Sequence, residues 1–367
     1  MPSNQMTRRH LVQGASWSVP VILGTSMVPS YAASQTCANG TFVAPAPAAD
    51  SDQAVTTTWT VPEGVSKICF SVLGGGGGRS YLSYMQGGAG GIITGELMVT
   101  PGQQLTLVVA AGGIGSPGLP ATGGGGYGDG GSVLAPETET INGGLNSYAA
   151  SGGGGSAILL GAGDSATPLV VAGGGGGGGF AGWWTLREPG ITPRQWTVGS
   201  RPSAGGAGQS VGLNSVYMSI ERVTATTYGG GGATGGKGGA GGANGTMTNQ
   251  IDSVQILEFA QLPGNPGQDG FKAKGADGNI SYIHNSGYTN AMRSGAGGGG
   301  YGGGGSGGIV GAASISEQSK STGQVGASGG GGGNYVSSQV LGATIALGSN
   351  GGTARSVRNH GAISILY

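Results

Sequence analysis

Five aromatic and basic residues in one short segment are the group best suited to chemistry in this 367-residue chain: Trp183, Trp184, Arg187, Arg194 and Trp196. Indole rings and guanidinium groups anchor protein partners and stack on sugar rings, so this composition is typical of a recognition surface. The segment follows the longest glycine run, and its Gly and Pro content is unlike that of a core strand. Two interpretations fit: a loop that binds a glycan or protein, or a small packed cap on one end of a glycine bundle.

Residues suited to catalysis are sparse. The three histidines, His10, His284 and His360, stand apart in the sequence, and no spacing of His, Cys or carboxylate residues fits a zinc site. Ser156 follows a glycine run, but without a strand-to-helix elbow we interpret it as a small residue that enters a strand. The sequence therefore predicts a protein that is not an enzyme, with no catalytic residue, metal or cofactor, and with His284 and His360 exposed.

Charge is equally sparse. Only 8% of the residues are charged and the formal net charge is zero, so the chain lacks the basic surface of a nucleic-acid-binding protein. The hydrophobic fraction, 37%, is too high for a solvated disordered chain. Glycine contributes 89 residues, many of them in runs, so we expect backbone hydrogen bonds to carry more of the fold than usual.

Residues 1–32 are typical of a signal peptide of the twin-arginine type. Arg8 and Arg9 precede a weakly apolar stretch, and Ser30 to Ala32 provide the small residues that a signal peptidase reads, so we expect cleavage after Ala32. No later segment has the roughly eighteen apolar residues of a membrane helix. We expect an extracellular or cell-surface protein with no integral membrane segment once the leader is removed.

The chain has two cysteines, Cys37 and Cys69, both after the predicted cleavage site. In an oxidising compartment we expect them to form a disulfide. This bond would hold the mature N-terminal segment, 33–53, to an early strand.

Short strand signals lie between the glycine runs. Segments 92–100 and 105–110 flank a Pro-Gly turn and predict a hairpin, and segments 157–160 and 169–172 predict a second. In all, about eight strands are predicted, which suits an antiparallel sandwich or jelly roll. No segment has the apolar period and caps of a helix, although 252–262 fits a helix and a strand equally.

The glycine runs themselves have two interpretations. Segment 235–243 repeats every three residues, which is the period of the polyproline II backbone. Such helices can pack side by side and bond to one another, because no Cβ keeps their backbones apart. Gly-rich segments can also be flexible linkers. The recurrence of the runs between strands favours packed helices.

Four motifs follow one another along the chain: Val-Pro-Glu-Gly-Val at 61–65, Val-Thr-Pro-Gly-Gln at 99–103, Pro-Leu-Val-Val-Ala at 168–172 and Asn-His-Gly-Ala-Ile-Ser-Ile at 359–365. This ordered series resembles the glycine-rich domain of bacterial surface proteins and phage tail proteins. The segment Pro-Leu-Val-Val-Ala followed by seven glycines is also similar to the glycine-rich domain of the anaplastic lymphoma kinase and leukocyte tyrosine kinase receptors.

The resemblance implies an all-β fold with little α-helix: a jelly-roll or TNF-like antiparallel β-sandwich that carries a bundle of packed polyglycine II helices. It implies a single glycine-rich domain over residues 54–367, with insertions near 180–228 and 247–292. In those families the domain binds protein ligands or displays host-binding loops. The scaffold carries over to this chain, but no defined set of binding residues does.

Together these observations predict a secreted, non-catalytic, glycine-rich surface protein that displays aromatic loops for adhesion, with a surface glycan or protein as its partner. The alternative is a structural coat or matrix protein that self-associates, because neutral surfaces associate readily. A secreted hydrolase is a remote alternative.

Overall fold

The computed structural model describes residues 37, 40–80, 85–115, 120–134, 143–146, 149–187, 194–196, 215–218, 223–249, 255–285, 288–316, 319–354 and 356–367. The chain has two units, Met1–Thr36 and Cys37–Tyr367, defined by the contacts within each. All the described residues belong to the second unit. In these residues the structure is almost entirely antiparallel β, with one short 3-10 turn, η3 (Gly163–Ser165), so the predicted all-β class is confirmed. None of the described helices is long and apolar enough to cross a membrane. The expected leader lies outside the described residues.

Alternation of apolar and polar residues builds the first sheet, called sheet I here. In β3 (Lys67–Leu73), the side chains of Ile68, Phe70 and Val72 are buried and those between them are half-exposed, as the two-residue period of a strand requires. Every pairing in the sheet is antiparallel. Its order is β1 (Thr41–Val43), β21 (Ala362–Leu366), β3, β4 (Gly91–Met98) and β20 (Val340–Leu347).

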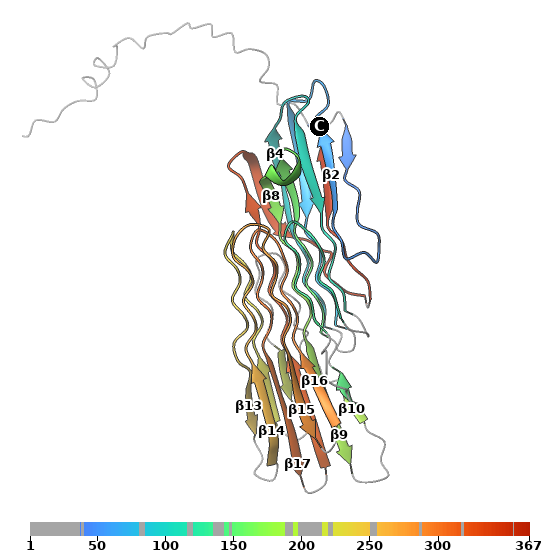
Figure 1. Ribbon diagram of the computed structural model, residues 1–367, viewed down its shortest axis with the longest axis vertical. Coiled ribbons are helices and arrows are strands. Elements are labelled where there is room, and N and C mark those ends of the chain that lie inside the picture. Colours follow the sequence, from blue (N-terminus) through green and yellow to red (C-terminus); the bar gives the residue numbers. More distant parts are fainter. Residues whose placement is uncertain are drawn as a thin grey trace, which may run out of the picture. The chain divides into compact units, whose positions relative to one another are not determined.

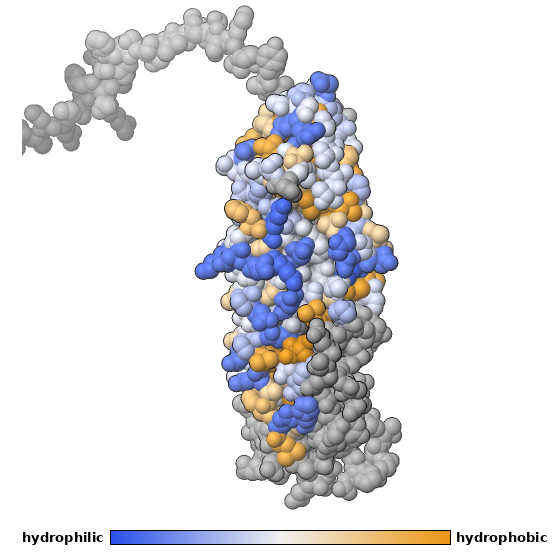
Figure 2. All heavy atoms as spheres, viewed as in Figure 1, coloured by the Kyte–Doolittle hydropathy of each residue, from blue (hydrophilic) through white to orange (hydrophobic). Residues whose placement is uncertain are grey.

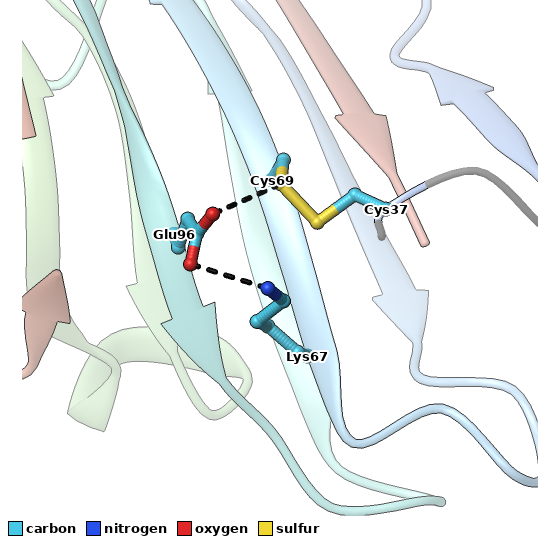
Figure 3. Close-up of a disulfide and its surroundings, with 4 residues drawn as sticks. All are labelled: Cys37, Lys67, Cys69 and Glu96. Atoms are coloured by element: carbon cyan, nitrogen blue, oxygen red, sulfur yellow. Dashed lines mark hydrogen bonds and ion pairs between the residues drawn. A yellow bond between two sulfur atoms is a disulfide. The ribbon is translucent and has the colours of Figure 1, made fainter. Parts of the chain in front are cut away.

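A disulfide joins Cys37 to Cys69 of β3, which confirms the predicted pairing (Figure 3). Beside it, Lys67 Nζ lies 3.3 Å from Glu96 Oε2, across the β3–β4 pair. The bond holds the segment that leads into β1 against the middle of sheet I.

Sheet II is also five-stranded and antiparallel. The predicted hairpin of 157–160 with 169–172 is confirmed, and Ser156 opens a strand as expected. The predicted hairpin of 92–100 with 105–110 is wrong, because the turn after β4 carries the chain across to the facing sheet rather than back along the same one. The order is β19 (Tyr335–Val336), β8 (Thr167–Ala172), β7 (Ser156–Leu160), β5 (Gln104–Val109) and β2 (Val55–Thr60).

Sheets I and II pack face to face around one hydrophobic core, so this part of the chain is a β-sandwich. Both sheets contribute residues to this core, all less than a tenth exposed. The large members are Trp59, Ile68, Phe70, Val72, Ile93, Leu97, Leu105, Leu107, Val109, Ile158, Leu169, Val170, Ile363 and Ile365.

A second group of strands consists of a five-stranded sheet, called sheet III here, and two three-stranded sheets. The sequence did not predict most of these strands. Ile309 in the middle of this group packs with Ile283 and Met292, whereas the next residue, Val310, packs with Ala225. One strand is therefore buried on both faces between two smaller sheets. Sheet III has the order β10 (Arg194–Trp196), β9 (Phe180–Arg187), β18 (Ser319–Gly326), β17 (Ile309–Ser316) and β14 (Gln255–Leu262). The smaller sheets are β11 (Ser215–Met218), β12 (Val223–Thr227) and β13 (Thr246–Asn249), and β15 (Ile280–Asn285), β16 (Tyr288–Arg293) and β6 (Gly143–Asn146).

The described residues contain 21 strands, against about eight predicted from the sequence. Segment 252–262, which fitted a helix and a strand equally, contains β14. The undetected strands β17 and β18 are rich in Gly, Ala and Ser, which are weak strand formers, and their β structure depends on the sheets that cover them.

Extended glycine-rich segments run between the group of strands with β2, β4 and β8 and the group with β9, β14 and β17 (Figure 1). Their hydrogen bonds follow a period of three residues. In segment 149–155, residues three apart donate to the same neighbouring segment. Residues 150 and 153 donate to segment 175–178, residues 151 and 154 to segment 111–114, and residues 152 and 155 to segment 128–131.

The carbonyl groups of the same segment accept hydrogen bonds from three further segments, 75–78, 124–127 and 296–299. Segment 149–155 is thus bonded to six neighbours, three through its N–H groups and three through its C=O groups. Its backbone polar groups are satisfied without belonging to a sheet, as burial requires.

Close approach, and not an unusual backbone angle, is what requires glycine in these segments. A Cβ on Gly153 would collide with the carbonyl oxygen of Gly75, and one on Gly174 would collide with that of Gly153. Neither glycine has a positive φ. Segment 235–243 lies partly at the surface, and there every third residue has a side chain that is exposed: Lys237, Ala240 and Ala243.

Candidate functional site

The five residues expected to bind a partner lie in two paired strands of sheet III. Trp183, Trp184 and Arg187 belong to β9, and Arg194 and Trp196 belong to β10. The strands are antiparallel, with Trp196 opposite Trp183. The sequence predicts a loop rather than a core strand here, but the structure forms two strands: β9 pairs with β18 along its whole length, and the Pro-rich part of the sequence falls between β9 and β10. Its role in recognition stays a prediction.

A second aromatic group, which the sequence analysis missed, is assembled from four distant segments. We call Tyr127, Phe271, Tyr301 and Tyr335 the aromatic cluster. The rings of Tyr301 and Tyr335 are stacked, with centroids 4.2 Å apart and planes 13° apart. Phe271 meets Tyr301 edge-on, with centroids 4.9 Å apart. Each of the three tyrosines closely follows a glycine run, which is the one signal in the sequence that could have grouped them.

The three tyrosines cover the outer face of sheet II. Their rings pack with apolar residues of β5, β7 and β8 that point away from the sandwich core, such as Val108, Leu159 and Val171. Tyr127 is buried, whereas the ring of Phe271 is 69% exposed. One end of the aromatic cluster, Tyr127, is therefore buried, and the other end, Phe271, is exposed to solvent. On the face drawn in Figure 2, apolar and polar residues alternate without forming one large apolar patch.

Phe271 is held outward by a hydrogen-bonded turn. The residues on either side of it, Gly270 and Lys272, have φ values of 98° and 54°, in the left-handed region that favours glycine. Gly270 N donates to Gly236 O at 2.7 Å, and the carboxylate of Asp269 accepts a hydrogen bond from Gly238 N at 2.6 Å. The turn is thus fastened by hydrogen bonds to a neighbouring glycine segment.

Charge and burial set the protonation of the cluster. Burial, together with the neighbouring phenols of Tyr301 and Tyr335, raises the pKa of Tyr127 to about 12. Burial also raises the pKa of Tyr301. Both phenols are therefore neutral at physiological pH. Lys272 Nζ lies 5.9 Å from the centroid of the Tyr127 ring, within the range of a cation–π interaction. The site offers an exposed ring, phenol hydroxyls and an ammonium group.

His360 departs from its expected exposure. It is half-buried, and its Nδ1 accepts a hydrogen bond from Gly112 N at 3.2 Å. Burial lowers the pKa of His360 and the charge of Arg358 lowers it further, while the backbone of Ala48 and Ala49 acts in the opposite direction. The imidazole is not exposed because it satisfies an amide at the edge of the glycine segments. His284, in contrast, is exposed as predicted.

Arg358 and Ser156 also serve the glycine segments. Arg358 is buried and donates to the carbonyl oxygens of Gly112 and Thr122, at 2.7 and 3.2 Å. Ser156 Oγ accepts a hydrogen bond from Ala110 N at 3.0 Å. Over the described ranges, no group of three His, Cys, Asp or Glu side chains could hold a metal ion. These polar side chains cap backbone groups where the glycine segments meet the sandwich.

Residues 51–215 match a family model described as a glycine-rich domain. The match spans 165 of the 367 residues, from just before β2 to the start of β11, and supports a glycine-rich domain family for this part of the chain. No curated protein matches the chain.

Proposed function

We propose that this protein is an exported, non-catalytic surface protein that binds a glycan or a protein through aromatic side chains presented on a rigid backbone scaffold. The observation that carries the proposal is Phe271, which is 69% exposed, supported by Tyr301 and fastened by hydrogen bonds to a neighbouring glycine segment. An exposed ring held in one orientation is the kind of group that anchors a partner at low entropic cost.

The scaffold, in this proposal, is a bundle of polyglycine II helices joined to a jelly-roll sandwich. The three-residue period of the hydrogen bonds supports it, because the polyproline II backbone has three residues per turn. The six hydrogen-bonded neighbours of segment 149–155 also support it, since that is how parallel rods of one kind pack around a central rod.

A sugar ring is the ligand that fits the aromatic cluster best. Sugars present apolar C–H faces that stack on aromatic rings and hydroxyl groups that need hydrogen-bonding partners. Phe271 supplies the ring, Tyr301 packs edge-on against it, and Lys272, the next residue in the chain, adds an ammonium group that lies over the ring of Tyr127. Trp183, Trp184, Arg187, Arg194 and Trp196 are proposed as a second recognition surface, on sheet III.

Export is part of the proposal. The twin-arginine-like leader at 1–32, with cleavage after Ala32, supports it, and the disulfide between Cys37 and Cys69 is compatible with an oxidising compartment. The resemblance to glycine-rich domains of bacterial surface and phage tail proteins supports a role in adhesion.

The test is binding of the purified protein to a glycan panel and to bacterial cell envelopes. We expect Phe271→Ala to weaken binding about tenfold or more, since anchor residues contribute upwards of about 1.4 kcal/mol. Leu134→Ala is the matched control, because Leu134 is a 49% exposed apolar residue outside the cluster. Unchanged melting temperatures would show that both variants are folded.

A triple variant, Trp183→Ala/Trp184→Ala/Trp196→Ala, tests the second surface in the same assay. Loss of binding in the triple variant alone would move the site to β9 and β10. Absence of binding by the unmodified protein to every glycan and envelope would contradict the proposed function.

A further inference from the structure

The sandwich is open along the outer edge of β20. Ile345 lies opposite Ile93 and therefore on the face of sheet I that forms the core, yet Ile93 is fully buried and Ile345 is 53% exposed. Leu347, two residues further along the same face, is 63% exposed. The reason is that β19, the edge strand of the facing sheet, has two residues and cannot cover the eight of β20.

The hydrogen-bonding edge of β20 is also open. In the part of the chain that the structure describes, β20 pairs with β4 on one side and is the last strand of sheet I. Edge strands are usually protected by lysine, proline or a bulge. A bulge is present between Leu341 and Thr344, where Gly342 has a φ of 58°, but the residues from Thr344 to Leu347 pair with β4 in regular register.

The residues of β4 opposite Thr344 to Leu347 are uncharged, and the charged residue of β4, Glu96, lies opposite Leu341 at the other end of β20. From Tyr335 to Thr353 the sequence contains no Asp, Glu, Lys, Arg, His or Pro. A partner that brought charge to β20 would bury it without a counter-charge, which is costly. The partner surface must therefore be as neutral as β20 itself.

We propose that β20 is an interface between two copies of this chain, in which the two strands pair antiparallel about a two-fold axis. Sheet I of one copy then continues into sheet I of the other. A second copy meets every requirement of the edge: it offers an uncharged strand, free strand hydrogen-bonding groups and the same apolar strip. The small number of charged residues, 8% of the chain, leaves little long-range repulsion between copies.

The pairing is self-complementary and closes at two copies, as a two-fold interface does. Pairing of β20 with the opposite edge of sheet I, β1, would instead be head-to-tail and would produce an open filament. The three residues of β1 are a poorer match for β20 than a second β20. This inference does not depend on the proposed binding function.

The experiment measures the mass of the full-length protein by sedimentation equilibrium over a wide concentration range. We expect a monomer–dimer equilibrium that Ile345→Lys or Leu347→Lys weakens about tenfold or more, because lysine on an edge strand opposes pairing. The matched control is Val43→Lys, since Val43 is 65% exposed on β1 at the other edge of the same sheet. It should dimerise like the unmodified protein.

Amide hydrogen exchange of the unmodified protein provides a second readout that needs no variant. Protection of β20 amides should rise with protein concentration, in step with the dimer fraction. A strict monomer at high concentration would overturn the proposal, as would β20 amides that are protected at every concentration, because another segment would then cover the edge. Loss of association in Val43→Lys would also overturn it in favour of a head-to-tail contact.

Discussion

A single methyl group is enough to test the packing of the glycine segments. Gly239 is buried, and a Cβ there would collide with the carbonyl oxygen of Gly231. The next residue, Ala240, is exposed and already carries a Cβ. The two positions are adjacent in sequence but differ in what surrounds them, so they form a matched pair.

We expect Gly239→Ala to lower the free energy of unfolding by about 1–3 kcal/mol, because the added carbon forces two backbones apart. Ala240→Ser should change it by less than about 0.5 kcal/mol, as surface substitutions do. Urea unfolding of both variants measures the difference. Equal stabilities for Gly239→Ala and the unmodified protein would mean that the segments are not closely packed.

The ionisation of Tyr127 provides a test of the aromatic cluster in alkaline solution. Burial raises the pKa of Tyr127 from 10.0 to about 12, so folding favours the neutral phenol. The stability that this contributes is complete below pH 10 and is lost as the pH rises from 10 towards 12. Tyr127→Phe should therefore reduce the loss of stability in this range, as measured by chemical unfolding at a series of pH values. An equal loss of stability in Tyr127→Phe and the unmodified protein would contradict this prediction.

Residue types and their spacing in the sequence predict one part of the candidate site but not the other. The tryptophans and arginines of 183–196 could be grouped because they are adjacent in sequence. Tyr127, Tyr301 and Tyr335 could not, because the glycine segments that bring them together lie far apart in the chain. Their neighbours are set by hydrogen bonds between backbones, and a glycine run contains no information about which other run it contacts.

At the scale of elements, the disulfide supports the weakest strand of sheet I. The strand β1 has three residues and pairs with β21, and Cys37 precedes it by four positions. We expect Cys37→Ser/Cys69→Ser to lower the free energy of unfolding by about 3 kcal/mol, because the bond closes a loop between residues 32 apart. A reducing agent should have the same effect on the unmodified protein and none on the double variant. Equal stability with and without reductant would contradict the prediction.

The predictability of each strand depended on what covers it. Strands such as β3, with one face in the core and one outside, alternate in sequence and could be predicted. The strand β17 is covered on both faces by smaller sheets and has small residues where the layers meet. A Cβ on Gly311, for example, would collide with the sulfur atom of Met292. The sequence of β17 therefore lacks the alternation of apolar and polar residues by which a strand is predicted.

At the scale of the whole molecule, the hydrogen bonds of the glycine segments join distant parts of the chain. Gly76 N donates to Asn359 O, and Gly91 N donates to Gly173 O. Each such bond closes a long loop before it gains a contact, so folding is slow. We expect refolding from denaturant to take on the order of seconds or longer, as in other proteins dominated by non-local pairing. Stopped-flow refolding in the millisecond range would contradict this expectation.

The backbone packing of the glycine segments also sets how stability varies with temperature. Unfolding them exposes mostly peptide groups to water, because many of their residues have no side chain. Hydration of peptide groups lowers the heat capacity, whereas hydration of apolar side chains raises it. The heat-capacity increment per residue should therefore fall below the usual value of about 12–15 cal/mol/K, which flattens the stability curve. A protein of this composition keeps more of its stability on cooling than one of equal length held together by a hydrophobic core.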